Sequence, residues 1–165
     1  MSITFPKPKL LGPKIPSLVV AGLLAAQFLL FGGSHSPDPK CTLTVERPHH
    51  STYLKEFKNI DAIKLNISSS CNVPQLFTEI TSRIQKIANN RELTGHNFRV
   101  ARVSSDSKNS HNVFFKDLFV DCKFGRSVQY LGIAEGYVQL RNGQKYPVSG
   151  SSSKFVAVPC EISAK

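Results

Sequence analysis

The 165-residue chain carries 21 Lys and Arg against 11 Asp and Glu, a formal net charge of +10. The basic residues are scattered without a run of three, so the charge does not indicate a nucleic-acid-binding motif. The chain contains no Trp, which disfavours an immunoglobulin-like domain built around a core Trp.

An uncharged apolar stretch follows a short basic tail at the N-terminus. Residues 15–33 carry no charge and are mostly apolar, with Gln27 as a polar interruption, and residues 1–14 contain three Lys and no acidic residue. About 17–25 apolar residues span a bilayer, and lysines on the short flank keep that flank in the cytoplasm. We therefore expect an uncleaved signal anchor, a transmembrane helix over 15–33 that holds the rest of the chain at the membrane, outside the cytoplasm. The alternatives are a cleaved signal peptide, which would release a secreted domain, and a buried soluble helix.

A short linker and one disulfide-bonded domain are expected after the apolar stretch. Residues 34–40 contain two Pro and form an extended spacer, and the extracytoplasmic domain spans 41–165. All four cysteines lie in this domain, and an even number in an exported domain predicts two disulfides. They are at least 30 residues apart, which disfavours a zinc site. The four are Cys41, Cys71, Cys122 and Cys160.

Alternation of apolar and polar residues predicts strands along most of the domain. The clearest case is 62–68, where Ile63, Leu65 and Ile67 share one face. The strands predicted from this pattern are 42–46, 62–68, 98–103, 113–121, 127–140 and a broken final strand over 144–159.

The C-terminal part contains the strongest local signals. Residues 128–140 place Val, Tyr, Gly, Ala and Leu at even positions, which predicts that this face is the inner one. Gly132 and Gly136 leave that face shallow and predict a bulge or a close neighbour. Asn142-Gly143 predicts a type I′ hairpin turn, and Pro147 predicts an edge strand or a bulge.

The segment 73–88 fits two structures. Its apolar residues Val73, Leu76, Ile80, Ile84 and Ile87 follow helical spacing, yet the residues from Leu76 to Ile84 also alternate. A strand here predicts an all-β fold, an antiparallel β-sandwich of about seven or eight strands behind one transmembrane helix. A helix at 73–88 predicts the α+β alternative. The surrounding β pattern favours the strand.

The disulfide pairing follows from the direction of the strands. In an up-and-down arrangement, Cys41 and Cys71 lie at one pole of the domain and Cys122 and Cys160 at the other. Two cysteines form a disulfide only when their Cα atoms approach to about 7 Å. We therefore predict Cys41–Cys71 and Cys122–Cys160.

Recognisable catalytic chemistry is missing from the sequence. It contains no Gly-x-Ser-x-Gly elbow, phosphate loop or His-Glu-x-x-His motif, and no metal or cofactor is expected. His49-His50 is a weak metal candidate because adjacent residues on a strand face opposite ways. Most aromatic residues are expected in the core, with a sugar-stacking platform as the alternative for part of the set. That set is Phe114, Phe115, Phe119, Phe124, Tyr130, Tyr137, Tyr146 and Phe155.

These observations favour a non-enzymatic protein. We expect a membrane-anchored, extracytoplasmic binding or structural domain of the cell envelope. Residues 34–165 carry 18 Lys and Arg against 11 Asp and Glu, a net charge of +7, so an acidic envelope polymer or a surface protein is the expected partner. The alternative function is a small secreted hydrolase or enzyme inhibitor with a site on the loop 104–112 or 150–153.

Overall fold

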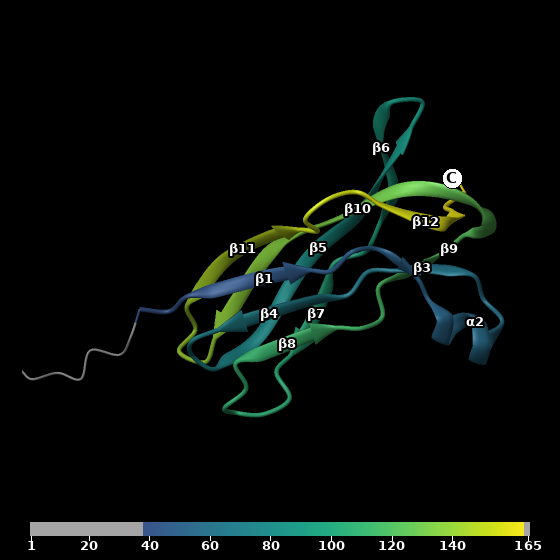
Figure 1. The fold of residues 1–165 in the computed structure, drawn as a ribbon. Helices are drawn as coiled ribbons and strands as arrows, with labels where there is room; N and C mark the ends of the chain where they lie inside the picture. Colours follow the sequence, from purple (N-terminus) through teal and green to yellow (C-terminus); the bar gives the residue numbers. More distant parts are fainter. Residues whose placement is uncertain (1–37, 164–165) are drawn as a thin grey trace, which may run out of the picture. The chain divides into compact units, whose positions relative to one another are not determined.

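The computed structural model describes residues 38–163, and these are mostly β structure in antiparallel sheets (Figure 1). Residues Pro39–Lys165 form a compact unit. The predicted tail, signal anchor and most of the linker lie outside the described residues. Within residues 38–163, no helix has the length and apolar character needed to cross a bilayer.

The first half of the unit contains the helix and the shorter strands. These elements are β1 (Cys41–Val45), β2 (His49–His50), α2 (Thr52–Lys58), β3 (Ala62–Lys64), β4 (Ile67–Cys71), β5 (Gln75–Ala88) and β6 (Arg91–Asn97). The second half contains β7 (Ala101–Ser104), β8 (Asn112–Phe115), β9 (Phe119–Asp121), β10 (Lys123–Leu140), β11 (Lys145–Ser151) and β12 (Val156–Glu161). The described residues thus form twelve strands, more than predicted, partly because the predicted strand 62–68 is split into β3 and β4.

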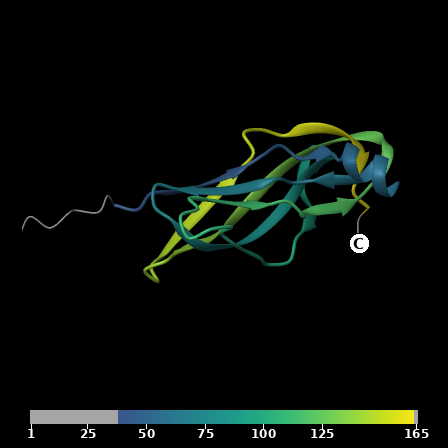
Figure 2. The ribbon, with the colours of Figure 1, turned by 90° about the horizontal axis from the view of Figure 1, so that it is seen from below.

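The described residues form three sheets. The small sheet has the order β1-β4-β8. The long sheet has the order β11-β10-β5-β6, with β12 also paired to β10 and β7 to β5, and it curls into half a barrel (Figure 1). The end sheet, β2-β3-β9, lies beside α2 at the end of the unit far from the start of β1 (Figures 1 and 2).

The core lies between the small sheet and the inner face of the long sheet. It includes Leu43 and Ile67 from the small sheet and Ile80, Tyr130 and Val138 from the long sheet. Burial in β10 follows the predicted even positions. A β carbon at Gly132 would collide with Leu65, and one at Gly136 would collide with the carbonyl oxygen of Glu79, so the predicted close neighbours are present.

Residues 75–88 form strand β5, so the helix of the α+β alternative is wrong. β5 pairs with β10 on one side and with β6 and β7 on the other. Burial in β5 repeats with a period of two, and the buried residues include Thr78, Ile80, Ser82 and Ile84. A strand with partners on both sides satisfies its backbone hydrogen bonds, and this outweighs the helical spacing of the isolated segment.

The disulfides are Cys41–Cys71 and Cys122–Cys160, with Cα atoms 4.1 and 5.5 Å apart, which confirms the predicted pairing. Cys41 faces Cys71 directly across β1 and β4. Phe124 faces Cys160 in the pairing of β10 with β12, which brings Cys122 to the end of β12. The disulfides indicate an oxidising, extracytoplasmic compartment.

The turn at Asn142-Gly143 differs in type from the predicted turn. Asn142-Gly143 does connect two strands, but the Gly143 amide donates to the Leu140 carbonyl and the Leu140 amide to the Gln144 carbonyl. Among residues 141–143, only Gly143 has a positive φ, of 87°. The loop is therefore a three-residue type I turn with a glycine bulge, and the predicted type I′ turn is wrong at this position.

A type I′ turn occurs elsewhere, between β5 and β6. Asn89 and Asn90 have φ of 52° and 59°, and they join the paired residues Ala88 and Arg91. Both central residues of a type I′ turn need positive φ, and Asn tolerates it better than most residues. Pro147 lies in β11 at the end of the long sheet's strand order, as predicted.

The helix α2 was not predicted. The Ser51 hydroxyl caps it by accepting from the Leu54 amide, and Asn59 ends it with a positive φ. Leu54 is buried, which attaches this short helix to the rest of the unit.

Candidate functional site

An open groove lies between β7 of the long sheet and β8 of the small sheet. On the opposite side of the two sheets β1 packs along β11, so closely that a β carbon at Gly150 would meet the Leu43 carbonyl oxygen at 2.5 Å. β7 pairs with β5 and β8 pairs with β4, and no pairing joins β7 to β8. The groove between them has a volume of about 570 Å³, within the range of binding pockets.

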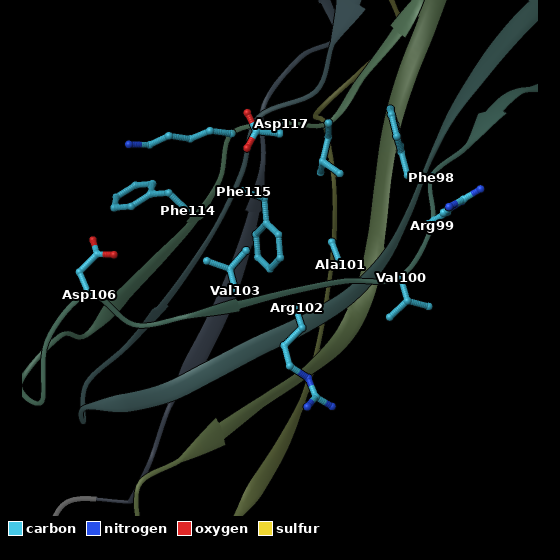
Figure 3. Close-up of a pocket in the computed structure, with 12 residues that line it drawn as sticks. Phe98, Arg99, Val100, Ala101, Arg102, Val103, Asp106, Phe114, Phe115 and Asp117 are labelled. Carbon is cyan, nitrogen blue, oxygen red and sulfur yellow. The ribbon is translucent and has the colours of Figure 1, made fainter.

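The groove has an apolar floor and a charged rim. Figure 3 shows Phe115 and Val103 lying between the two strands, with Ala101 beside them. Phe115 is buried and Val103 is half-buried, so the floor is only partly covered by the protein itself. The remaining lining residues are Phe98, Arg99, Val100, Arg102, Asp106, Phe114, Lys116, Asp117 and Leu118.

Arg102 is directed away from the floor and is already paired (Figure 3). Its Nε donates to Glu79 Oε2 at 2.6 Å, and its guanidinium lies 4.5 Å from the centre of the Phe77 ring. The hydrogen bond that Arg102 donates to Glu79 raises the pKa of Arg102. Within residues 38–163, Arg99 and Lys116 form no ion pair, so they are the rim cations available to a ligand.

The outer face of the long sheet carries a second group of aromatic and basic residues. Phe77 and Tyr137 lie on neighbouring strands with ring centres 6.0 Å apart. Arg102 covers the first ring, and Lys145 Nζ lies 4.5 Å from the centre of the second. These cation–π contacts hold two positive charges on a polar sheet face.

The aromatic residues named from the sequence do not form one platform. Tyr130 is fully buried, and its hydroxyl donates to the Cys160 carbonyl and accepts from the Ile162 amide. Burial raises the pKa of Tyr130. Phe114 is exposed at the groove, while Phe119 and Phe124 are exposed at the end sheet and the start of β10.

One residue of the histidine pair, His50, contacts an aspartate that is paired with a lysine. Asp61 accepts from Lys55 Nζ at 2.7 Å and lies 3.0 Å from His50 Nε2, which connects α2 to β2. The Lys55 hydrogen bond is the main cause of the lowered pKa of Asp61. His49 lies near the carbonyl of Arg47. In the part of the chain that the structure describes, no group of His, Cys, Asp and Glu is arranged to hold a metal ion.

The two loops considered for a hydrolase use their hydroxyl groups for backbone contacts. Ser105 Oγ donates to the Gln75 carbonyl, Ser110 Oγ donates to the Asn112 carbonyl, and buried Ser152 Oγ accepts from the Gly132 amide. These hydroxyls hold the loops in place. None of these three contacts is with a histidine, a common base for a serine nucleophile.

The sequence does not reveal the groove, because its two walls, β7 and β8, belong to different sheets. The sequence holds a weak local signal, because Val113, Phe114 and Phe115 are consecutive apolar residues and a strand cannot bury all three on one face. In the structure Phe114 is the exposed one. A large apolar residue on the outward face of a short strand indicates a contact surface, but its counterpart on β7 is visible only in the fold.

Comparison with known proteins leaves the family open. No family model matches the chain, and no curated protein matches it. One solved structure that matches is the solution structure of a protein described as a late embryogenesis abundant (LEA) protein. It is 13% identical, and the match covers 87% of this chain and 85% of that chain with a TM-score of 0.39. A likeness at that level supports no inference about function.

Proposed function

We propose that this protein is a non-enzymatic binding domain of the cell envelope, tethered outside the cytoplasm by a membrane anchor at 15–33. In this proposal the small and long sheets are the two layers of a β-sandwich. The observation that carries it is the groove between β7 and β8, which combines a partly open apolar floor with charged side chains of both signs on its rim. The indication of an oxidising compartment from the two disulfides supports the location.

Site-specific photocrosslinking in intact cells tests this function. A photoreactive phenylalanine replaces Phe114 at the groove, and the control replaces Phe57 on α2, which is even more exposed, at 72% against 54%. We expect a discrete crosslinked product from position 114 and none from position 57. Equal labelling at both positions, or none at position 114, would contradict the groove as the binding site.

Membrane topology is tested separately. A protease added to intact cells should digest the domain and leave the N-terminal tail protected. Digestion only after lysis would contradict the extracytoplasmic location, whatever the groove binds.

A second candidate function is binding of an acidic envelope polymer by the outer face of the long sheet. The observation that favours it is the pair of cations, Arg102 and Lys145, held over aromatic rings on that face. Binding of a polyuronate should weaken steeply with salt, because the Debye length falls from about 30 Å at 0.01 M to about 3 Å at 1 M. Lys145→Gln should weaken this binding, and Lys154→Gln, which removes an exposed charge from a loop, should change it less.

A further inference from the structure

The free edge of β8 exposes backbone groups to the groove. In an antiparallel pair, residues alternate between those bonded to the partner strand and those whose N–H and C=O point away. The Cys71 amide donates to the His111 carbonyl, which fixes this alternation for β4 and β8. Val113 and Phe115 therefore bond to β4, while Asn112 and Phe114 point their backbone groups away from it.

Only one of these two outward-facing residues is capped. The Ser110 hydroxyl donates to the Asn112 carbonyl at 2.8 Å and accepts from the Asn112 amide at 3.4 Å. Among the described residues, the N–H and C=O of Phe114 have no such partner. Asn112 thus ends the edge on one side, and Phe114 leaves a donor and an acceptor available.

The strand edge across the groove, that of β7, also has unpaired backbone groups. The Ser105 amide donates to the Leu76 carbonyl, which places Val103 among the residues of β7 that bond to β5. The backbone of Arg102 then points away from β5. The groove is bordered by two strand edges with unused hydrogen-bonding groups, and its floor is apolar.

This combination selects one class of ligand. A peptide in extended conformation presents the N–H and C=O that the Phe114 edge lacks, and every second side chain of that peptide faces the apolar floor. An acyl chain would fill the floor but leave the edge groups unpaired, and a polysaccharide would leave the apolar floor uncovered. The rim carries Arg99 and Lys116 as well as Asp106 and Asp117, so it favours neither an acidic nor a basic ligand.

We infer that the groove binds an extended peptide segment with apolar residues at alternating positions, which pairs through its backbone with the free edge of β8 at Phe114. This inference rests on the proposed binding function and names the ligand class of the same site. The bound peptide adds one strand to the small sheet, and its alternate side chains then lie against Val103 and Phe115.

The test uses the full chain in lipid nanodiscs and a defined probe. The probe is a labelled eight-residue peptide of alternating Val and Ser, and the control peptide has the same side chains with its backbone amides N-methylated at alternate positions. We expect binding by fluorescence anisotropy for the first peptide and at least about tenfold weaker binding for the second, equivalent to about 1.4 kcal/mol. Amide hydrogen exchange should show new protection at Phe114.

Two variants of one residue separate the backbone from the side chain. Phe114→Pro removes the outward-facing N–H without removing a bond to β4, whereas Phe114→Ala keeps the N–H and removes the ring. We expect the proline variant to lose about tenfold more affinity than the alanine variant. Circular dichroism shows that both variants are folded before their affinities are compared.

Several results would overturn the inference. Equal binding of the methylated peptide, protection at Arg102 instead of Phe114, or displacement of the probe by dodecanoic acid without any protection at Phe114 would each do so. Crosslinking at position 114 in cells with no affinity for the probe would reject the peptide and leave the binding function standing. Loss of both signals would reject both proposals.

Discussion

At the scale of single residues, a cluster of buried polar side chains connects the small sheet to the long sheet. Ser69 Oγ of the small sheet lies 2.9 Å from Gln75 Oε1 and 2.7 Å from Thr78 Oγ1, both on β5. Gln75 Nε2 donates to the carbonyls of Ser69 and His111. All three side chains are fully buried, so each polar group depends on the others for its hydrogen bonds.

Replacing Gln75 with Leu should therefore destabilise the domain. The change removes Gln75 Oε1, which accepts from the buried hydroxyls of Ser69 and Thr78. Only one of these two hydroxyls can then donate to the other, and a buried unsatisfied group costs about 1–3 kcal/mol. Urea unfolding followed by far-UV circular dichroism measures the loss. The control Gln129→Leu, on the exposed face of β10, should stay within about 0.5 kcal/mol of the wild type. A loss no larger than that of the control would show that the cluster contributes nothing.

The carboxylate of Asp61 should make stability depend on acid pH. Its folded-state pKa is lowered, chiefly by the hydrogen bond from Lys55. The unfolded chain therefore binds the proton more readily. The stabilisation is complete above the unfolded pKa of about 3.9 and is lost as pH falls through the lower folded value. The melting temperature of Asp61→Asn should fall less than that of the wild type across this window. Asp106→Asn should behave like the wild type, and an Asp61→Asn curve parallel to the wild type would contradict the assignment.

At the scale of elements, the hairpins show how turn chemistry and strand pairing interact. Arg141 to Gly143 form a three-residue loop in which only the glycine has a positive φ, while Asn89 and Asn90 both adopt it. The pairing of Ala88 with Arg91 leaves two residues for the β5–β6 turn, and two-residue loops favour type I′ or II′ turns. The positive φ of both Asn89 and Asn90 makes this one type I′.

Changing Asn90 to Gly should stabilise the β5–β6 hairpin. Glycine adopts the required positive φ without a steric penalty, and we expect a gain of about 0.5–1 kcal/mol in the free energy of unfolding. Asn90→Ala should shift the same measurement in the opposite direction, since a β carbon disfavours this conformation. If both variants are less stable than the wild type, the Asn90 side chain has a role that its backbone conformation does not explain.

For the whole molecule, the two disulfides close the ends of the fold. Cys41–Cys71 joins neighbouring strands of the small sheet across 30 residues, and Cys122–Cys160 joins the start of β10 to β12 across 38. Closing loops of these two lengths removes a similar amount of entropy from the unfolded chain, so the two bonds should stabilise the fold to a similar extent.

Replacing either cysteine pair with serine should lower the free energy of unfolding by about 3–4 kcal/mol. Denaturant unfolding of each double variant measures this, with the wild type in reducing buffer as the comparison. A much smaller loss for one pair would mean that native-state strain offsets the entropy gain at that bond.

Several features of this protein were determined by local sequence. The even face of β10, the edge position of Pro147 and the disulfide pairing all follow from a period of two and a chain that reverses direction at each turn. The existence of a hairpin at Asn142-Gly143 was equally local.

Other features were decided only by the tertiary structure. Residues 75–88 are a strand because β10, β6 and β7 supply hydrogen-bond partners that the segment lacks in isolation. The turn at Asn89-Asn90 follows from that pairing. The groove exists because β1 packs along β11 on one side, while β7 and β8 on the other side do not pair with each other. Such contacts join residues far apart in the chain, and no local pattern records which distant strand edges will face each other.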